Sequence, residues 1–506
     1  MSSKIFSGAT VGLEAAKIEI EADTGGGELG SFTIVGLPDA AVQESRERVR
    51  SAIKNSGFNF PKIKVTVNLA PADLRKQGPS FDLPIALSVL SQISNLKELD
   101  DWSDKIFLGE LALSGEVRAV SGVLPIALAA RAWDIKEIFV PAENAQEAGL
   151  AVGITIYPVH DFREVIDHLT GTKKIDPLIA EAHRFVNTET MFDMTAVKGQ
   201  EHVKRAMEIA AAGGHNMLMS GPPGSGKTLL ARTITSILPD LILDEALEIT
   251  KIYSVAGKLP AKSALITNRP FRSPHHTSSG VALVGGGTWP RPGEISLAHR
   301  GVLFLDELPE FSRQTLENLR QPLEEGVIQV SRAANTLSFP AQFMLVAAMN
   351  PCPCGHATDP EKHCICSTQQ ILNYKKKISG PILDRIDLFV EVPRLSYEKL
   401  ASTSTGDNSA TIKRRVEAVR EKTRVRFAKE GYFVNAEMSS QAVKEYCQLG
   451  DDCQKLLKQA VDQLHLSARS YYRILKIART IADLENSSEI RLEFLAEALQ
   501  YRPKVD

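Results

Sequence analysis

Apolar and polar residues follow two different periods along this chain of 506 residues. In its first third, short runs with strand-type patterning alternate with runs in which apolar residues recur at helical spacing. The strand-type runs are Lys17–Glu21, Ser31–Val35, Lys62–Leu69 and Ile135–Val140, and the helical runs are Ala40–Ser56, Asp82–Leu90 and Leu124–Ala132. This alternation predicts a mixed α/β domain that ends near His168.

A second α/β pattern follows Thr170–Asn187, a stretch with no strong apolar period that is typical of a linker. It contains the apolar runs Asn216–Ser220 and Phe343–Met349 and extends to about Pro393. After the polar stretch Ser404–Ala410, helical patterns continue toward the end of the sequence. We therefore expect an α/β protein with a domain at residues 1–170, a linker at 171–190, a second α/β domain at 191–395 and a helical lid at 396–506.

The composition is that of an ordinary globular protein, with 43% hydrophobic and 24% charged residues. The 59 basic and 61 acidic residues give a net charge of −2, so contact with nucleic acid would require a local basic surface. The sequence has no apolar run long enough to span a membrane and no signal-peptide core at its start. We expect a soluble, cytoplasmic protein with no membrane partner.

The stretch Met219–Arg232, MSGPPGSGKTLLAR, fits the pattern G-x-x-x-x-G-K-[ST] between an apolar strand and a helix. In this pattern glycine N–H groups surround the phosphates, Lys227 reaches the β- and γ-phosphates, and the Thr228 hydroxyl ligates Mg²⁺. ATP and Mg²⁺ are therefore the predicted cofactors. The predicted nucleotide-binding residues are Gly221, Pro222, Pro223, Gly224, Ser225, Gly226, Lys227 and Thr228.

A second motif, GVLFLDELPEF at Gly301–Phe311, is an apolar strand that ends in two carboxylates. Asp306 is predicted to hold the Mg²⁺ shell and Glu307 to polarise the attacking water. With the P-loop, this pair predicts an enzyme that hydrolyses ATP.

Other residues occur in the order that a ring-forming ATPase requires. Val197 and Gln200 precede the P-loop where such enzymes hold adenine, and Asn350 follows an apolar strand where it can orient the lytic water. Arg385 lies on a polar turn suited to a neighbour's γ-phosphate, the arginine-finger arrangement. From the helical lid, Arg469 or Arg473 is placed to reach the γ-phosphate. The alternative for each arginine is a surface salt bridge.

Four longer strings carry a family resemblance: Phe271–Gly287, Pro290–Phe311, Ala347–Gly355 and Ser379–Leu388. They resemble the Mg-chelatase-like AAA+ ATPases, and within them the competence-protein branch. The resemblance implies a homohexameric ring with helicase activity that drives branch migration of DNA during recombination in natural transformation. It also implies single-stranded, forked or branched DNA as partner, with a recombinase as a candidate second partner. By motif position, Asn350 and Arg469 take the sensor roles and Arg385 the finger role, with Arg473 as the substitute for Arg469.

Two insertions have a composition suited to DNA. The first carries Arg272, His275, His276 and Arg291 around a glycine triplet. The second is a hairpin, Leu323–Ser338, in which Gly326 turns the chain and Arg332 lies near the tip. Long insertions in compact units are usually functional, although solvated loops would share this composition.

Four cysteines, Cys352, Cys354, Cys364 and Cys366, form the pattern C-x-C-x9-C-x-C. Four thiolates on one short loop satisfy the tetrahedral coordination of structural Zn²⁺, although most zinc knuckles have C-x2-C spacing. The interpretations left open are a structural zinc site and unligated thiols.

The segment KQGPSFDLPIALSVL and the residues after it resemble the proteolytic domain of Lon, which has a ribosomal S5 domain 2-like fold. Ser80 occupies the position of the nucleophile, but Leu124 stands where the activating lysine is expected. A serine without a base is a poor nucleophile, so we expect an inactive protease domain in which Ser80 caps a helix. A chelatase motor subunit and, less favoured, an ATP-dependent protease are the rival functions to a DNA translocase.

Overall fold

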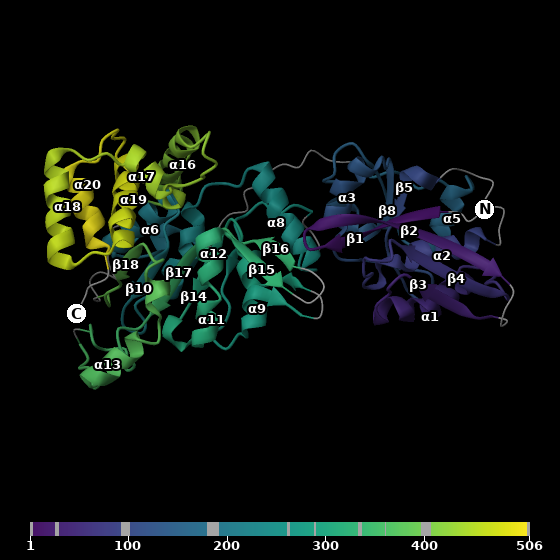
Figure 1. Cartoon of the computed structure of the whole chain (residues 1–506), viewed down its shortest axis with the longest axis horizontal. Helices are drawn as coiled ribbons and strands as arrows, with labels where there is room; N and C mark the ends of the chain where they lie inside the picture. Colours follow the sequence, from purple (N-terminus) through teal and green to yellow (C-terminus); the bar gives the residue numbers. More distant parts are fainter. Residues whose placement is uncertain are drawn as a thin grey trace. The chain divides into compact units, whose positions relative to one another are not determined.

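The computed structural model describes residues 4–25, 30–92, 102–179, 192–260, 264–287, 290–331, 336–359, 361–395 and 406–502. The chain forms two compact units (Figure 1). Unit 1 comprises Met1–Phe185 and Leu243–Ile266, and unit 2 comprises Val186–Ile242 and Thr267–Asp506. The predicted α/β class with a helical C-terminal region is confirmed. None of the described helices combines the length and the apolar character that crossing a membrane requires.

Unit 1 is built on a seven-stranded mixed sheet. Its strands, in spatial order, are β3 (Phe32–Val35), β4 (Lys64–Ala70), β2 (Glu14–Gly25), β1 (Lys4–Val11), β5 (Lys105–Phe107), β8 (Glu137–Pro141) and β9 (Thr155–Val159). β2 is antiparallel to both β1 and β4, and the other neighbours are parallel. The main helices of this unit in the first part of the chain are α1 (Ala40–Asn55), α2 (Asp82–Ser91), α3 (Val123–Ala130) and α5 (Phe162–Leu169).

Local sequence explains several of these elements. The Asp39 side chain accepts a hydrogen bond of 2.8 Å from the Val42 N–H and thereby caps α1. Alternate residues of β4 are buried, as expected for a strand whose side chains point to opposite faces. The strand and helix runs expected around these positions are present, with ends displaced by a few residues.

The expectation that Ser80 caps a helix is wrong. Ser80 lies inside a short 3₁₀ turn, Pro79–Phe81, and α2 has no side-chain cap. The Ser80 carbonyl instead accepts a hydrogen bond of 3.1 Å from the Gly109 N–H. The buried Asp82 carboxylate at the start of α2 pairs with the Arg48 guanidinium across 2.6 Å, which fixes α2 against α1.

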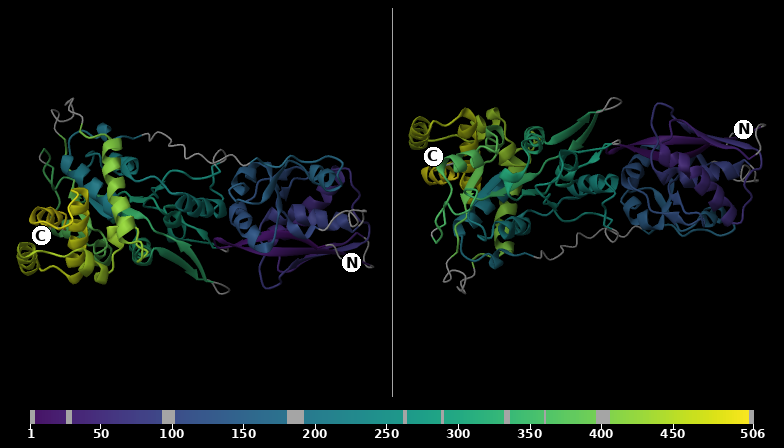
Figure 2. Two further views of the ribbon diagram at one scale, coloured as in Figure 1. Left: turned by 90° about the horizontal axis from the view of Figure 1, so that it is seen from above. Right: turned by 90° about the horizontal axis from the view of Figure 1, so that it is seen from below.

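Unit 2 is built on a five-stranded sheet in which all neighbouring strands are parallel. Their order is β11 (Phe271–Arg272), β14 (Val302–Leu305), β17 (Met344–Met349), β10 (Met217–Ser220) and β18 (Leu388–Glu391). Every residue of β14 and β17 is buried, which suits parallel strands covered on both faces. A separate two-stranded ribbon, β15 (Val327–Ser331) and β16 (Thr336–Pro340), extends away from this sheet (Figure 2). The hairpin expected at Leu323–Ser338 therefore begins later than predicted, because Leu323–Glu325 are helical and Gly326 caps that helix instead of turning the hairpin.

The C-terminal region of unit 2 is helical, as predicted. Its helices are α16 (Ser409–Arg426), α17 (Ser440–Tyr446), α18 (Asp451–Leu464), α19 (Ala468–Leu484) and α20 (Leu492–Gln500). Helices α16 and α19 pack on α6 (Glu201–Gly213), which precedes the P-loop strand. The apolar face of α16, with Ile412, Val416 and Val419, is buried in the same core as the sheet.

One segment from the ATPase part of the sequence packs in unit 1. Helix α8 (Leu243–Val255) lies against α3, and its Ser254 carbonyl accepts a hydrogen bond of 3.1 Å from the Gly122 N–H. The Ser254 hydroxyl also donates to the buried Glu147 carboxylate, whose pKa is raised by burial. The long insertion after the P-loop helix therefore contributes a helix to the N-terminal fold.

Ser80→Ala is expected to leave ATPase activity near the wild-type value, and unit 1 is expected to have no peptidase activity. The reason is that Leu124, buried in α3, offers no basic group that could activate the Ser80 hydroxyl. The amine of Lys76, which is fully buried, already donates a hydrogen bond to the Pro71 carbonyl. Casein degradation and ATPase rate of both proteins are the measurements. ATP-dependent degradation that disappears in Ser80→Ala would show a working protease.

Candidate functional site

The P-loop joins the end of β10 to α7 (Lys227–Thr233) and forms one wall of a hollow of about 380 Å³. Gly221 has no room for a side chain, because a Cβ there would lie 2.1 Å from the Val392 carbonyl oxygen. Gly224 and Gly226 have φ of +77° and +88°, which a residue with a Cβ rarely adopts. The loop therefore exposes its backbone N–H groups at the N-terminus of α7, where phosphate binds favourably. The residues that line the hollow are Pro223, Gly224, Ser225, Gly226, Lys227, Thr228, Leu229, Asp306, Glu307, Met349 and Asn350.

Lys227 lies between the P-loop and the end of β17. Its Nζ donates to the Gly221 carbonyl across 2.7 Å, to the Pro222 carbonyl across 2.9 Å and to Asn350 Oδ1 across 3.3 Å. Burial lowers the pKa of Lys227, while the charges of Asp306 and Glu307 act in the opposite direction. The structure thus brings the predicted phosphate-binding lysine and the predicted water-orienting Asn350 together.

The two groups expected to hold Mg²⁺ are also adjacent. Thr228 Oγ1 donates to Asp306 Oδ2 across 2.9 Å, which places a hydroxyl and a carboxylate oxygen side by side. Oxygen ligands of this kind, together with phosphate oxygens and water, are the usual environment of Mg²⁺ in nucleotide sites. The arrangement fits an ATP–Mg²⁺ complex.

Glu307 directly follows Asp306 and adopts left-handed backbone geometry, with φ of 53° and ψ of 47°. This conformation is unfavourable for a residue with a side chain, and residues with strained backbones of this kind cluster at active sites and ligand clamps. The Glu307 carboxylate is 54% exposed and lies 3.3 Å from His276 Nδ1. His276, predicted to contact DNA, is thus beside the residue predicted to activate water.

Two predicted adenine-site residues have different environments. Gln200 is buried, and its Nε2 donates to the carbonyls of Ser225 and Pro393 across 3.1 Å in each case. This amide supports the P-loop backbone. Val197 is buried in the core of unit 2, and contact of either residue with adenine remains a prediction.

The predicted finger and lid arginines lie close to one another. Arg385 pairs with Glu324, and Arg469 approaches the same carboxylate at 3.3 Å. Arg473 is 8% exposed and donates to the carbonyls of Leu383 and Ile386. Arg469, at 60% exposure, therefore suits a sensor role better than Arg473, which fixes α19 to the turn before β18.

The predicted DNA-contacting residues are placed as follows. Arg272 makes a two-pronged ion pair with Glu294, with distances of 2.6 and 2.7 Å. The rings of His275 and His276 are tilted by 34° with their centroids 4.1 Å apart, and His275 Nδ1 lies 2.9 Å from Thr277 Oγ1. Arg291 is exposed on β13 (Arg291–Pro292). Arg332 lies outside the described residues.

The four cysteines gather into one cluster, and their sulfur atoms all lie within 4.8 Å of one another. Cys352 Sγ is 3.4 Å from Cys354 Sγ and 3.6 Å from Cys364 Sγ, and the Cys354 N–H donates to Cys366 Sγ. Hydrogen bonds from the backbone of His356 and Ile365 lower the pKa of Cys354 to about 6. Four converging sulfur ligands of this kind fit tetrahedral Zn²⁺.

The cysteine loop packs directly on the P-loop. A Cβ at Gly355 would lie 2.6 Å from Pro223 Cδ, so only glycine allows this approach. After the loop, Tyr374 on α13 (Thr368–Lys375) makes a hydrogen bond to the Asn350 backbone, and burial raises its pKa to about 12. Tyr374 contacts Asn350 and Glu324 contacts Arg385, and the sequence analysis identified neither because neither occurs in a motif.

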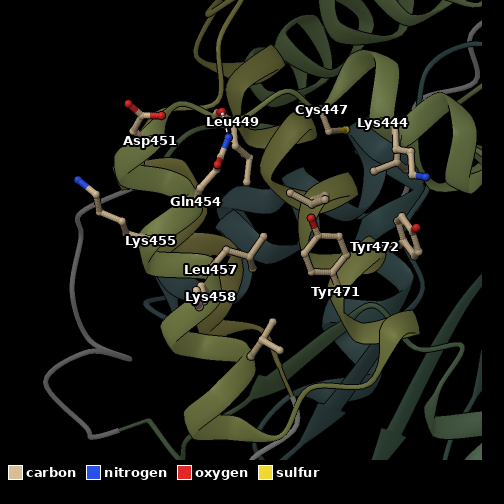
Figure 3. Close-up of a pocket in the computed structure, with 13 residues that line it drawn as sticks. Lys444, Cys447, Leu449, Asp451, Gln454, Lys455, Leu457, Lys458, Tyr471 and Tyr472 are labelled. Carbon is tan, nitrogen blue, oxygen red and sulfur yellow. Dashed lines mark hydrogen bonds between the residues drawn. The ribbon is translucent and has the colours of Figure 1, made fainter.

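A larger hollow, of about 870 Å³, lies among α17, α18 and α19 (Figure 3). Its wall combines apolar groups such as Leu457 with Tyr471, while Lys455 lies at its margin. Gln454 donates to the Leu449 carbonyl across 2.9 Å and thereby fixes part of the wall. The glycine loop and the carboxylate pair line the smaller hollow, so that hollow, although it is not the larger of the two, is the candidate nucleotide site.

Comparison with known proteins gives three matches to family descriptions. Residues 193–400 match "Magnesium chelatase, subunit ChlI", residues 19–144 match "Subunit ChlI of Mg-chelatase", and residues 406–502 match its C-terminal region. The chain is 45% identical to competence protein ComM of Haemophilus influenzae, with 99% of this chain and 97% of that protein covered. It is 44% identical to YifB of Escherichia coli, again covering 99% of this chain and 97% of the relative. The magnesium-chelatase 38 kDa subunit of Rhodobacter capsulatus is 26% identical over 36% of this chain and 55% of its own length.

Lys227→Ala is expected to abolish ATP binding, whereas Glu307→Gln is expected to retain binding and to lose turnover by at least about 100-fold. The second variant keeps the phosphate and Mg²⁺ ligands and removes only the carboxylate that polarises water. Nucleotide binding and phosphate release are the measurements. Glu310→Gln is the matched control, because Glu310 pairs with Lys377 at 3.1 Å. Equal loss of binding in the Lys227 and Glu307 variants would contradict this division of roles.

Zinc is expected at about one ion per chain, and its removal is expected to weaken ATP binding because the cysteine loop contacts Pro223. Elemental analysis and ATP affinity before and after chelation are the measurements. Cys364→Ser should lose the metal, while Cys447→Ala should retain it because Cys447 is buried in the helical region. Metal-free protein with unchanged ATP affinity would show that the thiols are only packed together.

Proposed function

Because the chain belongs to the Mg-chelatase family of AAA+-type ATPases, we propose that it is an ATP-driven hexameric ring that translocates on DNA. Its task would be branch migration during recombination of DNA taken up in natural transformation. The observation that carries this proposal is the 45% identity to a protein named for competence, which extends over 99% of the chain. Such a ring would act in the cytoplasm, a reducing compartment that keeps the cysteine thiols free to bind metal.

The nucleotide chemistry follows from the contacts at the P-loop. ATP bound with Mg²⁺ supplies the phosphoryl group that is transferred to water. Lys227 would exchange its bonds to the Gly221 and Pro222 carbonyls for phosphate oxygens, and Thr228 with Asp306 would hold the metal. Glu307 would accept a proton from the attacking water, while Asn350, bonded to Lys227, would fix the direction of attack.

Completion of the site requires positive charge on the far side of the γ-phosphate. We assign this role to Arg385 and Arg469 of a neighbouring chain. The Arg385 carbonyl accepts a hydrogen bond of 2.9 Å from Asn216 Nδ2, and Asn216 Oδ1 accepts one of 2.8 Å from Leu345. Asn216 thereby ties the finger segment to the central strands, so movement of the finger and of the sheet would be coupled.

Contact with DNA is assigned to the two insertions. The loop after β11 carries His275 and His276, and Arg332 directly follows β15 in the sequence. Because His276 lies 3.3 Å from Glu307, the same loop would connect DNA with the hydrolytic carboxylate. Zn²⁺, where the four cysteines hold it, would have a structural role beside the P-loop.

A chelatase motor is the second candidate, since all three family descriptions carry that name. The Rhodobacter chelatase subunit, however, matches only 36% of this chain, whereas the competence protein matches 99%. The difference in coverage favours the DNA-directed function. The function of an ATP-dependent protease is disfavoured because Leu124 provides no basic group to activate the Ser80 hydroxyl.

The ATPase rate with and without forked or four-way DNA tests the proposal. Stimulation by DNA, together with ATP-dependent movement of a labelled four-way junction that Glu307→Gln lacks, is the expected result. Equal rates with and without DNA, and no junction movement by purified rings, would contradict DNA translocation and favour the chelatase motor.

A further inference from the structure

Glu324 lies where two predicted γ-phosphate-binding arginines from distant segments meet. It is on α12 (Arg320–Glu325) and is 46% exposed. Its Oε1 is paired with Arg385, which is 8% exposed, and lies 3.3 Å from Nη2 of Arg469 on α19. A single carboxylate oxygen is therefore shared by the two cations.

The surrounding charges leave Arg385 incompletely satisfied. Arg469 has a second carboxylate, Asp384, at 3.8 Å, and the nearby Arg320 pairs with Glu317 at 3.0 Å. The buried Nε of Arg385 has no hydrogen-bond partner among the described residues. Burial lowers the pKa of Arg385, and the charges of Arg469 and Arg320 lower it further. Besides its bonds to Glu324 and to the Pro381 carbonyl, Arg385 thus has one unused donor, Nε, that an anion could engage.

Helix α12 continues directly into the proposed DNA-binding ribbon. Gly326 ends the helix with φ of 66°, its N–H donates to the Pro322 carbonyl, and its carbonyl accepts from the Ala341 N–H across 2.7 Å. Val327, the next residue, opens β15. A tilt of the ribbon would therefore displace the Glu324 side chain relative to the arginines.

We propose that Glu324 is an exchangeable counter-ion that restrains Arg385 and Arg469 until the ribbon binds DNA. When α12 moves, the arginines transfer from the carboxylate to the γ-phosphate held by the neighbouring chain. This inference rests on the proposed function, because it assigns the link between DNA and hydrolysis. Glu324 acts through the arginines and is a positioning residue.

The size of the effect follows from the exposure of the pair. Partly exposed arginine–carboxylate pairs shift an equilibrium by roughly two- to five-fold. Glu324→Gln is therefore expected to lower the KM for ATP and to raise DNA-free turnover at low ATP by roughly that factor, with kcat little changed. Stimulation by forked DNA should decrease by the same factor, because part of the restraint is already removed.

Glu325→Gln is the matched control. Glu325 is the next residue of the same helix and accepts a hydrogen bond of 2.9 Å from Gln321, not from an arginine. It should behave as wild type. Binding of a non-hydrolysable ATP analogue to preassembled rings gives an independent readout, in which the gain from Glu324→Gln should disappear when Arg385→Ala is added.

These measurements test the role of Glu324 and DNA translocation separately. DNA-free turnover and analogue binding of Glu324→Gln equal to those of Glu325→Gln, or lower than wild type, would overturn the role of Glu324. Failure of forked DNA to stimulate the wild-type protein would contradict DNA translocation, and the DNA-free measurements would still decide whether Glu324 restrains the arginines.

Discussion

The parallel pairing of β10, β14 and β17 is the constraint on which the nucleotide site depends. Ala347 of β17 lies opposite Leu218 of β10 on one side and Leu305 of β14 on the other. The carboxyl ends of the three strands therefore meet at one edge, where ligands of open α/β sheets bind. The P-loop, Asp306 and Asn350 follow these three ends, so the bonds of Lys227 and Thr228 across the site are consequences of strand register.

Two further contacts connect this edge of the sheet with segments outside the P-loop and the carboxylate pair. The cysteine loop contacts the P-loop through Gly355 and Pro223, so a change in the conformation of this loop would reach the P-loop backbone. On the ribbon side, Glu324 connects α12 with Arg385 and Arg469. In our proposal, these two contacts would make ATP hydrolysis depend on the conformation of the cysteine loop and on a ligand bound to the ribbon.

Features encoded in short, continuous stretches were predictable from the sequence. The P-loop, the carboxylate pair after β14 and the cysteine pattern each depend on local spacing, and the helices of the lid have clear apolar periods. The positions of Ser80 and α8 were not predictable in this way. The 3₁₀ turn at Ser80 and the packing of Ser254 against Gly122 depend on contacts between segments far apart in the sequence.

The cluster of Arg385, Arg469 and Glu324 could likewise be predicted only in part from the sequence. Arg385 and Arg469 were identifiable from order along the chain, but Glu324 is 145 positions from Arg469, and no motif marks the carboxylate. Solvated surface helices commonly carry such glutamates, and only the folded arrangement distinguishes this one. Arg272 likewise looks like a free DNA contact in sequence, although in the structure it pairs with Glu294.

We propose that each ATP site is completed by arginines from a neighbouring chain. The most direct measurement is the ATPase rate of rings mixed from Lys227→Ala and Arg385→Ala chains, each of which is expected to be inactive alone. Mixed rings would contain interfaces with an intact P-loop on one side and an intact arginine on the other, so we predict partial recovery of hydrolysis that depends on the mixing ratio. No recovery at any ratio, in rings shown to have exchanged subunits, would contradict it.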